Sequence, residues 1–168
     1  MSTKENLSFR QDAASTPPRA FRPHDHDSCV AGAMQAAESL CAESGARLTP
    51  VRRRVLEILL EGHRPMGAYD VLARLDAEGL GSKPPVAYRA LGFLVDNGLA
   101  HRIERLNAFI ACPRPTDDNH APAFLICRGC GSVAEVSATL PGIPKGFRVE
   151  RTTVEAEGLC AACTDSPE

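Results

Sequence analysis

Two pairs of cysteines in the C-terminal third carry the clearest chemistry of the sequence. Cys127 and Cys130 are separated by two residues, as are Cys160 and Cys163, with 29 residues between the pairs. This spacing lets both sulfurs of a pair reach one ion, so two pairs complete a tetrahedral four-thiolate site. We therefore predict a structural zinc site, closed to substrate. A redox dithiol is the alternative, but it needs a single pair at a helix start in a βαβ context, which is not found here.

Four other potential ligands lie nearer the middle of the chain: His101, Cys112, His120 and Glu135. One ion held by all four would join the N-terminal part of the chain to the C-terminal part. A thiolate and a carboxylate neutralise Zn²⁺, and the thiolate disfavours Mn²⁺ or a labile Fe²⁺ site. From spacing alone the alternative stays open, in which the histidines are surface residues and the cysteine is a small core residue.

A third candidate site is the polar face of a helix that we predict from Pro84 to Asn97. Tyr88, Arg89 and Gly92 share this face, and Lys83 stands just before it. Arginine can reach guanine or a phosphate in the major groove, and tyrosine can contact a thymine methyl or a phosphate. The pattern is typical of a DNA-reading helix. The alternative is a solvated face that carries one arginine by chance.

The predicted elements around these residues form an α+β protein. Apolar residues recur at helical spacing, with Pro or Thr at helix starts and Gly at helix ends. The expected helices span 29–44, 50 to just before 62, 68–78 and 84–97, and strand-like segments follow at 99–105 and 108–112. Helices with short connections followed by a hairpin predict a winged helix-turn-helix domain.

The remaining segments predict the domain organisation. Short strands are expected at 123–126, 132–136 and 147–157, in a small C-terminal α/β domain that holds the cysteine pairs. The predicted limits are a disordered tail at 1–27, a winged-helix domain at 28–112, a hinge at 113–120 and a dimerisation and zinc-binding domain at 121–168. The tail contains His24-Asp25-His26-Asp27, which could bind metal but is interpreted as solvated.

Charge is unevenly distributed along the chain, whose formal net charge is -2. Ten basic and seven acidic residues between Arg47 and Arg105 leave +3, whereas four basic and eight acidic residues between Asp117 and Glu168 leave -4. Positive charge concentrated in one half can bind phosphate despite a negative total. Seven cysteines without a signal peptide or an apolar run of membrane-spanning length predict a cytoplasmic protein with reduced thiols.

Several stretches, in order, resemble the Fur (ferric uptake regulator) family, and the details are most similar to its zinc uptake regulator branch. The resemblance covers roughly residues 29 to 163. The similar stretches are Arg47-Leu48-Thr49-Pro50-Val51-Arg52, Ala68-Tyr69-Asp70-Val71-Leu72, Lys83-Pro84-Pro85-Val86-Ala87-Tyr88-Arg89-Ala90-Leu91, Cys127-Arg128-Gly129-Cys130-Gly131 and Gly158-Leu159-Cys160-Ala161-Ala162-Cys163.

The resemblance implies a homodimer that binds double-stranded operator DNA through its winged helices, with Tyr88 and Arg89 as contacts. It implies two Zn²⁺ per subunit, a structural ion on the four paired cysteines and a regulatory ion on His101, Cys112, His120 and Glu135. The expected function is a zinc-responsive repressor of zinc-uptake genes, not an enzyme, with no small-molecule substrate and no membrane partner.

Three alternatives remain. The first is an iron, manganese or peroxide-responsive regulator of the same family, whose sites resemble sets of His and carboxylate ligands without the Cys112 thiolate. The second is a zinc hydrolase, which needs an open coordination position with a bound water. The third is a zinc module that binds other proteins.

The sequence departs from the family's pattern in two places. Val86 stands where Thr or Ser is usual, so one DNA contact is in doubt. The dimerisation domain commonly contains a helix between its strands, but Ser137 to Gly146 holds Pro141, Gly142, Pro144 and Gly146. Because proline and glycine disfavour a regular helix, we expect this element to be shortened or replaced by a loop.

Overall fold

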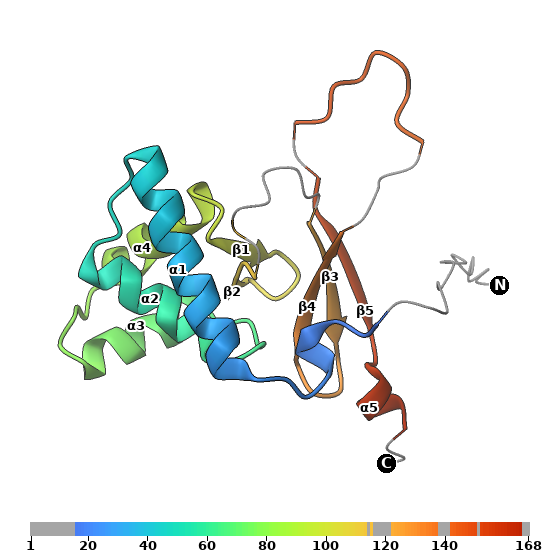
Figure 1. Cartoon of the computed structure of the whole chain (residues 1–168), viewed down its shortest axis with the longest axis horizontal. Helices are drawn as coiled ribbons and strands as arrows, with labels where there is room; N and C mark the ends of the chain where they lie inside the picture. Colours follow the sequence, from blue (N-terminus) through green and yellow to red (C-terminus); the bar gives the residue numbers. More distant parts are fainter. Residues whose placement is uncertain (1–15, 114, 116–121, 138–141, 151, 166–168) are drawn as a thin grey trace.

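The computed structural model describes residues 16–113, 115, 122–137, 142–150 and 152–165. Helices gather on one side of the molecule and a three-stranded sheet lies on the other, with a two-stranded hairpin between them (Figure 1). This arrangement confirms the predicted α+β class. The elements are η1 (Arg19–Phe21), α1 (His26–Ser44), α2 (Pro50–Leu60), α3 (Ala68–Ala77), α4 (Pro84–Asp96), β1 (Ala100–Ile103), β2 (Ala108–Ala111), β3 (Pro122–Cys127), β4 (Val133–Ser137), β5 (Val154–Gly158) and α5 (Ala161–Thr164).

Start and stop residues explain the ends of the helices. Pro50 and Pro84 open α2 and α4, where a missing backbone N–H breaks no helical hydrogen bond. Gly45 ends α1 in the left-handed conformation, with φ of 68°. Thr49 stands at the N-cap of α2, but its side chain makes no capping hydrogen bond.

The main core lies among α1, α2, α3, α4 and the hairpin. Apolar side chains from each helix are fully buried in it, including Val55, Val71, Leu75, Leu91 and Leu94. Burial of this apolar surface is the main stabilising force for the helical part. An ion pair adds a link on the surface, where Nε and Nη2 of Arg54 donate to the two carboxylate oxygens of Glu78 at 2.6 and 2.7 Å.

A second apolar cluster joins the hairpin to the three-stranded sheet. The strands β1 and β2 pair antiparallel, and the face of this hairpin that points away from the helices packs on β3 and β4. The buried members of this cluster are Ile103, Ile110, Phe124, Ile126 and Val133. The hairpin therefore contributes to two cores, one on the helices and one on the sheet.

The sheet has the strand order β4-β3-β5. β3 pairs antiparallel with β4 and parallel with β5, and Phe124 stands opposite Glu135 in the first of these ladders. Hydrogen bonds also join the sheet to the loop after α2 and to the turn of the hairpin. The N–H of Val133 donates to the carbonyl of His63 at 2.8 Å, and the Glu155 carboxylate accepts from the N–H groups of Glu104 and Arg105.

Several local predictions differ from the structure. Residues 19–21 and 26–27, predicted in a disordered tail, form η1 and the start of α1, and η1 packs against β4. Residues 147–150, predicted to begin a strand, belong to no strand, because β5 starts only at Val154. The described residues 142–150 contain no helix, as expected from their prolines and glycines. The short helix α5 was not predicted.

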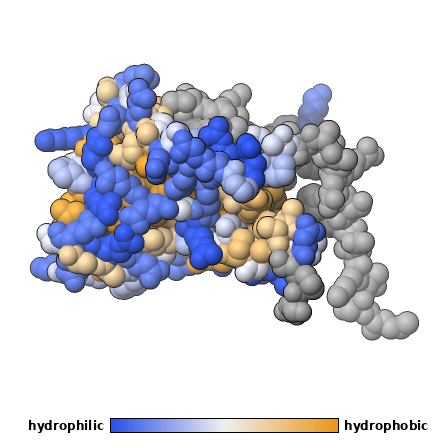
Figure 2. Space-filling view, turned by 60° about the horizontal axis from the view of Figure 1, so that its bottom comes forward, coloured by the Kyte–Doolittle hydropathy of each residue, from blue (hydrophilic) through white to orange (hydrophobic). Residues whose placement is uncertain are grey.

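One face of the molecule shows how hydrophilic and apolar side chains are distributed over the surface. Hydrophilic side chains cover much of the visible helical side, and apolar ones gather in a patch toward the sheet (Figure 2). None of the helices in the described part of the chain is both long and apolar enough to cross a membrane.

Candidate metal centres and nucleic-acid interface

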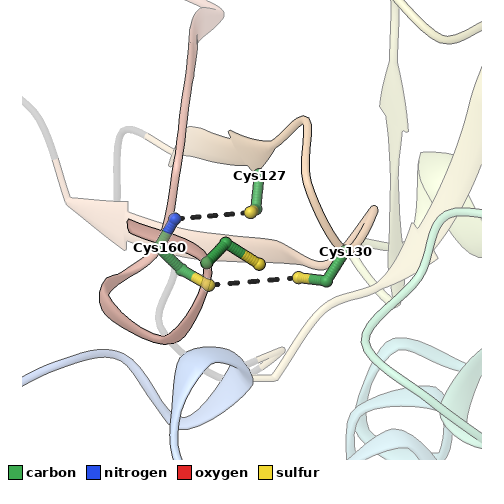
Figure 3. Close-up of side chains that lie close together, drawn as sticks. Cys127, Cys130 and Cys160 are labelled. Atoms are coloured by element: carbon green, nitrogen blue, oxygen red, sulfur yellow. Dashed lines mark hydrogen bonds between the residues drawn. The ribbon is translucent and has the colours of Figure 1, made fainter. Parts of the chain in front are cut away.

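The four paired cysteines come together at one end of the sheet. Cys127 ends β3 and Cys130 lies in the turn that follows, while Cys160 precedes α5 and Cys163 lies within it. Their sulfur atoms all lie within 4.8 Å of one another, and those of Cys130 and Cys160 are 4.0 Å apart (Figure 3). A tetrahedral Zn²⁺ with bonds of about 2.3 Å separates its sulfur ligands by about 3.8 Å. The cluster therefore fits one zinc ion.

Gly129 suits the close approach of the two zinc knuckles, which are the turns that carry the two cysteine pairs. A Cβ atom added there would lie 3.0 Å from both Cβ and Sγ of Cys163, closer than side chains normally pack. Because β3 and β5 run parallel, both strands end at the same end of the sheet, and this brings the two knuckles together. The backbone N–H of Cys160 then donates to Sγ of Cys127 at 3.3 Å (Figure 3).

The thiols of this cluster have opposite pKa shifts. Backbone hydrogen bonds from Cys130 and then Cys160 lower the pKa of Cys127 to about 6, because they stabilise its thiolate. The Ser132 hydroxyl lowers the pKa of Cys130. Hydrogen bonds with Cys160 and then Cys127 raise the pKa of Cys163 to about 12. The protein thus stabilises some thiolates but not all four together, and a divalent cation would supply the missing positive charge.

The second candidate centre joins the hairpin to the sheet. His101 lies on β1, Cys112 directly follows β2 and Glu135 lies on β4. Their ligand atoms all lie within 4.8 Å of one another, and Nε2 of His101 is 3.2 Å from a carboxylate oxygen of Glu135. Cys112 is 2% exposed and the Glu135 side chain 3%. An imidazole, a thiol and a carboxylate in a mostly buried site are a donor set that suits zinc.

The structure brings together three of the four residues predicted for this centre. The fourth, His120, lies outside the described residues. The pairing of the strands explains why His101, Cys112 and Glu135 lie close together. The N–H of Cys112 donates to the carbonyl of Leu99, which continues the hairpin ladder by one residue beyond β2. The Phe124 ring packs 5.3 Å from the His101 ring, between centroids, and stands opposite Glu135 in the sheet.

The helix α4 has the two faces that its sequence predicts. Ala87, Ala90, Leu91 and Leu94 are buried in the core, while Lys83, Tyr88 and Arg89 are exposed. A Cβ atom added to Gly92 would meet nothing within 4 Å, so a partner can approach the backbone there. Val86 is half-buried against Gly81, whose added Cβ would lie 2.9 Å from a Val86 methyl. Val86 thus packs against the loop before α4.

One exposed residue of this surface, Tyr69, was not predicted from the sequence. Tyr69 in α3 is 67% exposed, Tyr88 is 50% exposed, and their rings meet edge to face at 6.4 Å between centroids. The sequence did contain a signal, because Tyr69 falls outside the apolar stripe of Val71, Leu72 and Leu75. Two adjacent exposed aromatic side chains beside Arg89 form a surface suited to nucleic-acid contacts.

Comparison with known proteins agrees with this geometry, although no family model matches the chain. The chain is 37% identical to the zinc uptake regulation protein of Escherichia coli (strain K12), over 77% of this chain and 80% of that protein. It superimposes on a zinc uptake regulator complexed with zinc and DNA with a TM-score of 0.71 at 32% identity, covering 85% of this chain and 97% of the other. For holo XcZur the TM-score is 0.68 at 35% identity, covering 79% and 97%. The chain therefore belongs to the zinc uptake regulator branch of the Fur family.

Proposed function

We propose that this protein is a zinc-responsive transcriptional repressor that binds palindromic operators of zinc-uptake genes when zinc-loaded. One observation carries the proposal: His101, Cys112 and Glu135 meet although they come from the hairpin and from the sheet. A ligand set shared between two parts of a chain makes metal binding sensitive to how those parts are arranged. The similarity to a zinc uptake regulator crystallised with zinc and DNA supports the same function.

We assign the structural zinc ion to the four paired cysteines. When bound, zinc supplies a divalent positive charge and a tetrahedral geometry at this site. Cys127 and Cys130 hold the end of β3, while Cys160 and Cys163 hold the end of β5 and α5. Four protein ligands close the coordination sphere, so this site stabilises the sheet and does not catalyse.

We assign the regulatory ion to His101, Cys112, Glu135 and His120. Both histidines bind as neutral rings, and the thiol and the carboxylate bind as anions. Holding these side chains together would fix the winged helix relative to the sheet. Since binding free energies are reciprocal, operator DNA should also raise the affinity of this site for zinc.

We assign the DNA contacts to the exposed face of α4. Arg89 and Tyr88 would read the major groove or hold its phosphates, and Lys83 at the start of the helix would bind a phosphate. The geometry adds Tyr69, which is exposed beside Tyr88. The Arg52 guanidinium, 3.6 Å above the Phe93 ring, braces α2 against α4 and helps to hold the reading face in place.

We propose a homodimer assembled through the C-terminal part. Ile143, Phe147 and Val149 are exposed there, and their burial against a second subunit would remove apolar surface from water. A two-fold dimer presents its two reading helices to half-sites about one helical turn apart, which matches a palindromic operator. We also keep the limits 28–112, 113–120 and 121–168 for the DNA-binding domain, the hinge and the dimerisation domain.

The rival within the family is an iron, manganese or peroxide-responsive regulator. The buried Cys112 disfavours this alternative, because a buried thiolate prefers zinc to Mn²⁺ or labile Fe²⁺. We further propose that the protein is not an enzyme, since a centre closed by four protein ligands leaves no position for a reacting water. We place it in the cytoplasm, where the ligand thiols remain reduced.

A metal comparison tests this proposal. Binding to an AT-rich palindrome from a zinc-uptake promoter is measured by fluorescence anisotropy while buffered free Zn²⁺, Fe²⁺ or Mn²⁺ is raised. The proposal expects binding to appear with zinc at the lowest free-metal concentration. Equal or stronger responses to Fe²⁺ or Mn²⁺ would support the rival regulator, and binding that ignores metal would contradict both.

A further inference from the structure

A third cluster of metal-binding side chains lies where the chain enters α1. His24 precedes the helix, His26 begins it and Cys29 lies in its first turn, while His63 reaches them from the loop between α2 and α3. All four residues are half-buried. The ligand atoms of His24, His26 and Cys29 lie within 4.8 Å of one another. None of these residues belongs to either centre described above.

Hydrogen bonds to backbone carbonyls orient the His24 and His26 rings in the way that is common for metal-binding histidines. Nδ1 of His24 lies 3.1 Å from the carbonyl oxygen of Arg22, and Nε2 of His26 lies 2.9 Å from that of Leu60. In a neutral ring the nitrogen facing a carbonyl carries the proton, so the other nitrogen keeps its lone pair. Metal-binding histidines typically hold their second nitrogen in this way. Nδ1 of His26 thereby keeps its lone pair, and Nε2 of His24 faces Nε2 of His63.

The spacing of the rings fits one shared ion. Nε2 of His63 lies 3.1 Å from Nε2 of His24. Nitrogen ligands of a tetrahedral zinc ion with bonds of about 2.0 Å are separated by about 3.3 Å. The three ring centroids are 5.0 to 5.5 Å from one another, so the His63 ring stands beside the His24 and His26 rings as the outer member of the cluster.

We propose that His24, His26, Cys29 and His63 form a third metal site, which takes Zn²⁺ or a similar borderline divalent ion. Three imidazoles and one thiolate are a donor set that favours such ions over Mg²⁺, Ca²⁺ or Mn²⁺.

The position of the cluster gives this site a structural consequence. His63 also accepts, through its carbonyl, the 2.8 Å hydrogen bond from Val133 of the sheet. The segment before His24 contains η1, which packs against β4. A cavity of about 480 Å³ is lined by Cys29 and His63 together with Glu135. Metal at the third site would therefore clamp the N-terminal segment onto the loop that contacts the sheet, and its ligands Cys29 and His63 line the same cavity as Glu135 of the second centre.

Titration of the full-length apo-protein with Co²⁺ tests the site without using DNA binding. The wild type is compared with the double variant His24→Ala/His26→Ala by metal content at saturation and by absorption. We expect the wild type to bind one more metal ion per subunit than the double variant. Equal metal content in the two proteins would overturn the proposal.

Two cysteines of the same helix provide a matched pair for a second readout. Cys29→Ala removes the proposed ligand, whereas Cys41→Ala removes a core thiol that is 3% exposed. We expect Cys29→Ala to lower the intensity of the sulfur-to-cobalt charge-transfer band, and Cys41→Ala to leave it unchanged. An equal band in wild type and Cys29→Ala would overturn the proposal, and this pair carries the test if the double variant fails to fold. Because no readout involves DNA, the result is independent of the proposed regulatory function.

Discussion

Nε2 of His101 lies 3.2 Å from a carboxylate oxygen of Glu135, although the first residue belongs to the hairpin and the second to the three-stranded sheet. The apolar cluster of Ile103, Ile110 and Phe124 holds the two elements together beside this pair. The second candidate centre is therefore partly assembled by packing. Rearrangement of the hairpin against the sheet would separate these side chains, and we expect this to couple metal binding to the DNA-binding surface.

Glu135→Gln tests the carboxylate ligand. An amide oxygen is a weaker and neutral donor, so we expect at least a tenfold loss of zinc affinity at the second centre, on the order of the losses seen when metal-site partners are removed. Chelator competition on the full-length protein measures it. Glu150→Gln, an exposed glutamate outside the centre, is the charge-matched control. Equal affinities for the two variants would remove Glu135 from the ligand set.

Gly129→Ala tests the close approach of the two zinc knuckles. The new Cβ would press on Cys163 at 3.0 Å, so we expect the four-cysteine site to lose zinc more readily and the free energy of unfolding to fall by about 1–3 kcal/mol. Gly158→Ala is the control, because an added Cβ there meets nothing within 4 Å. Thermal unfolding and retained zinc are measured for both. A Gly129→Ala protein as stable and as zinc-loaded as Gly158→Ala would show that the knuckles do not need this glycine.

Arg89→Ala tests the reading face of α4. If Arg89 pairs with guanine, we expect a loss of about 1–3 kcal/mol in operator affinity and relaxed specificity at one position. If it binds a phosphate, all sequences should weaken alike and the salt dependence should decrease by about one counterion. Arg148→Ala removes the same charge from the C-terminal part and serves as control. Operator binding that is unchanged in Arg89→Ala would place the DNA contacts elsewhere.

Glu78→Gln tests the link between α2 and α3. The hydrogen bond from Arg54 lowers the pKa of Glu78 below 4.5, so the carboxylate contributes stability above that pH and loses it as the pH falls through the lowered value. We expect wild type to unfold at a higher temperature than Glu78→Gln at neutral pH, and this gap to close in acid. A gap that persists below the pKa of Glu78 would show that ionisation is not the cause.

Local signals in the sequence predicted the helical part well. Pro50, Pro84 and Gly45 mark helix ends because each favours one backbone conformation, and the observed ends lie close to those predicted. The N-terminus of α1 was placed too late, since His24-Asp25-His26-Asp27 has no apolar periodicity. Its N-cap is Asp25, whose side chain accepts a hydrogen bond from the N–H of Ser28.

Long-range pairing was harder to predict. The spacing of the four cysteines indicates their common ion, because each pair is local. The parallel pairing of β3 with β5 that brings them together has no local signature. Spacing and charge proposed His101, Cys112 and Glu135 as ligands but left the alternative open, since each is an ordinary residue by itself, and the resemblance then favoured the metal site. His63 was missed because only the folded chain brings it to His24, 39 residues away.

Zinc-dependent operator binding by Cys112→Ser, compared with wild type, tests the central claim most directly. Anisotropy is followed as buffered free Zn²⁺ rises, and retained zinc is measured to confirm that the four-cysteine site stays loaded. We predict that wild type binds the operator only as zinc rises and that Cys112→Ser loses this response while keeping its structural zinc. A variant that responds to zinc as well as wild type does would contradict the assignment of the regulatory site.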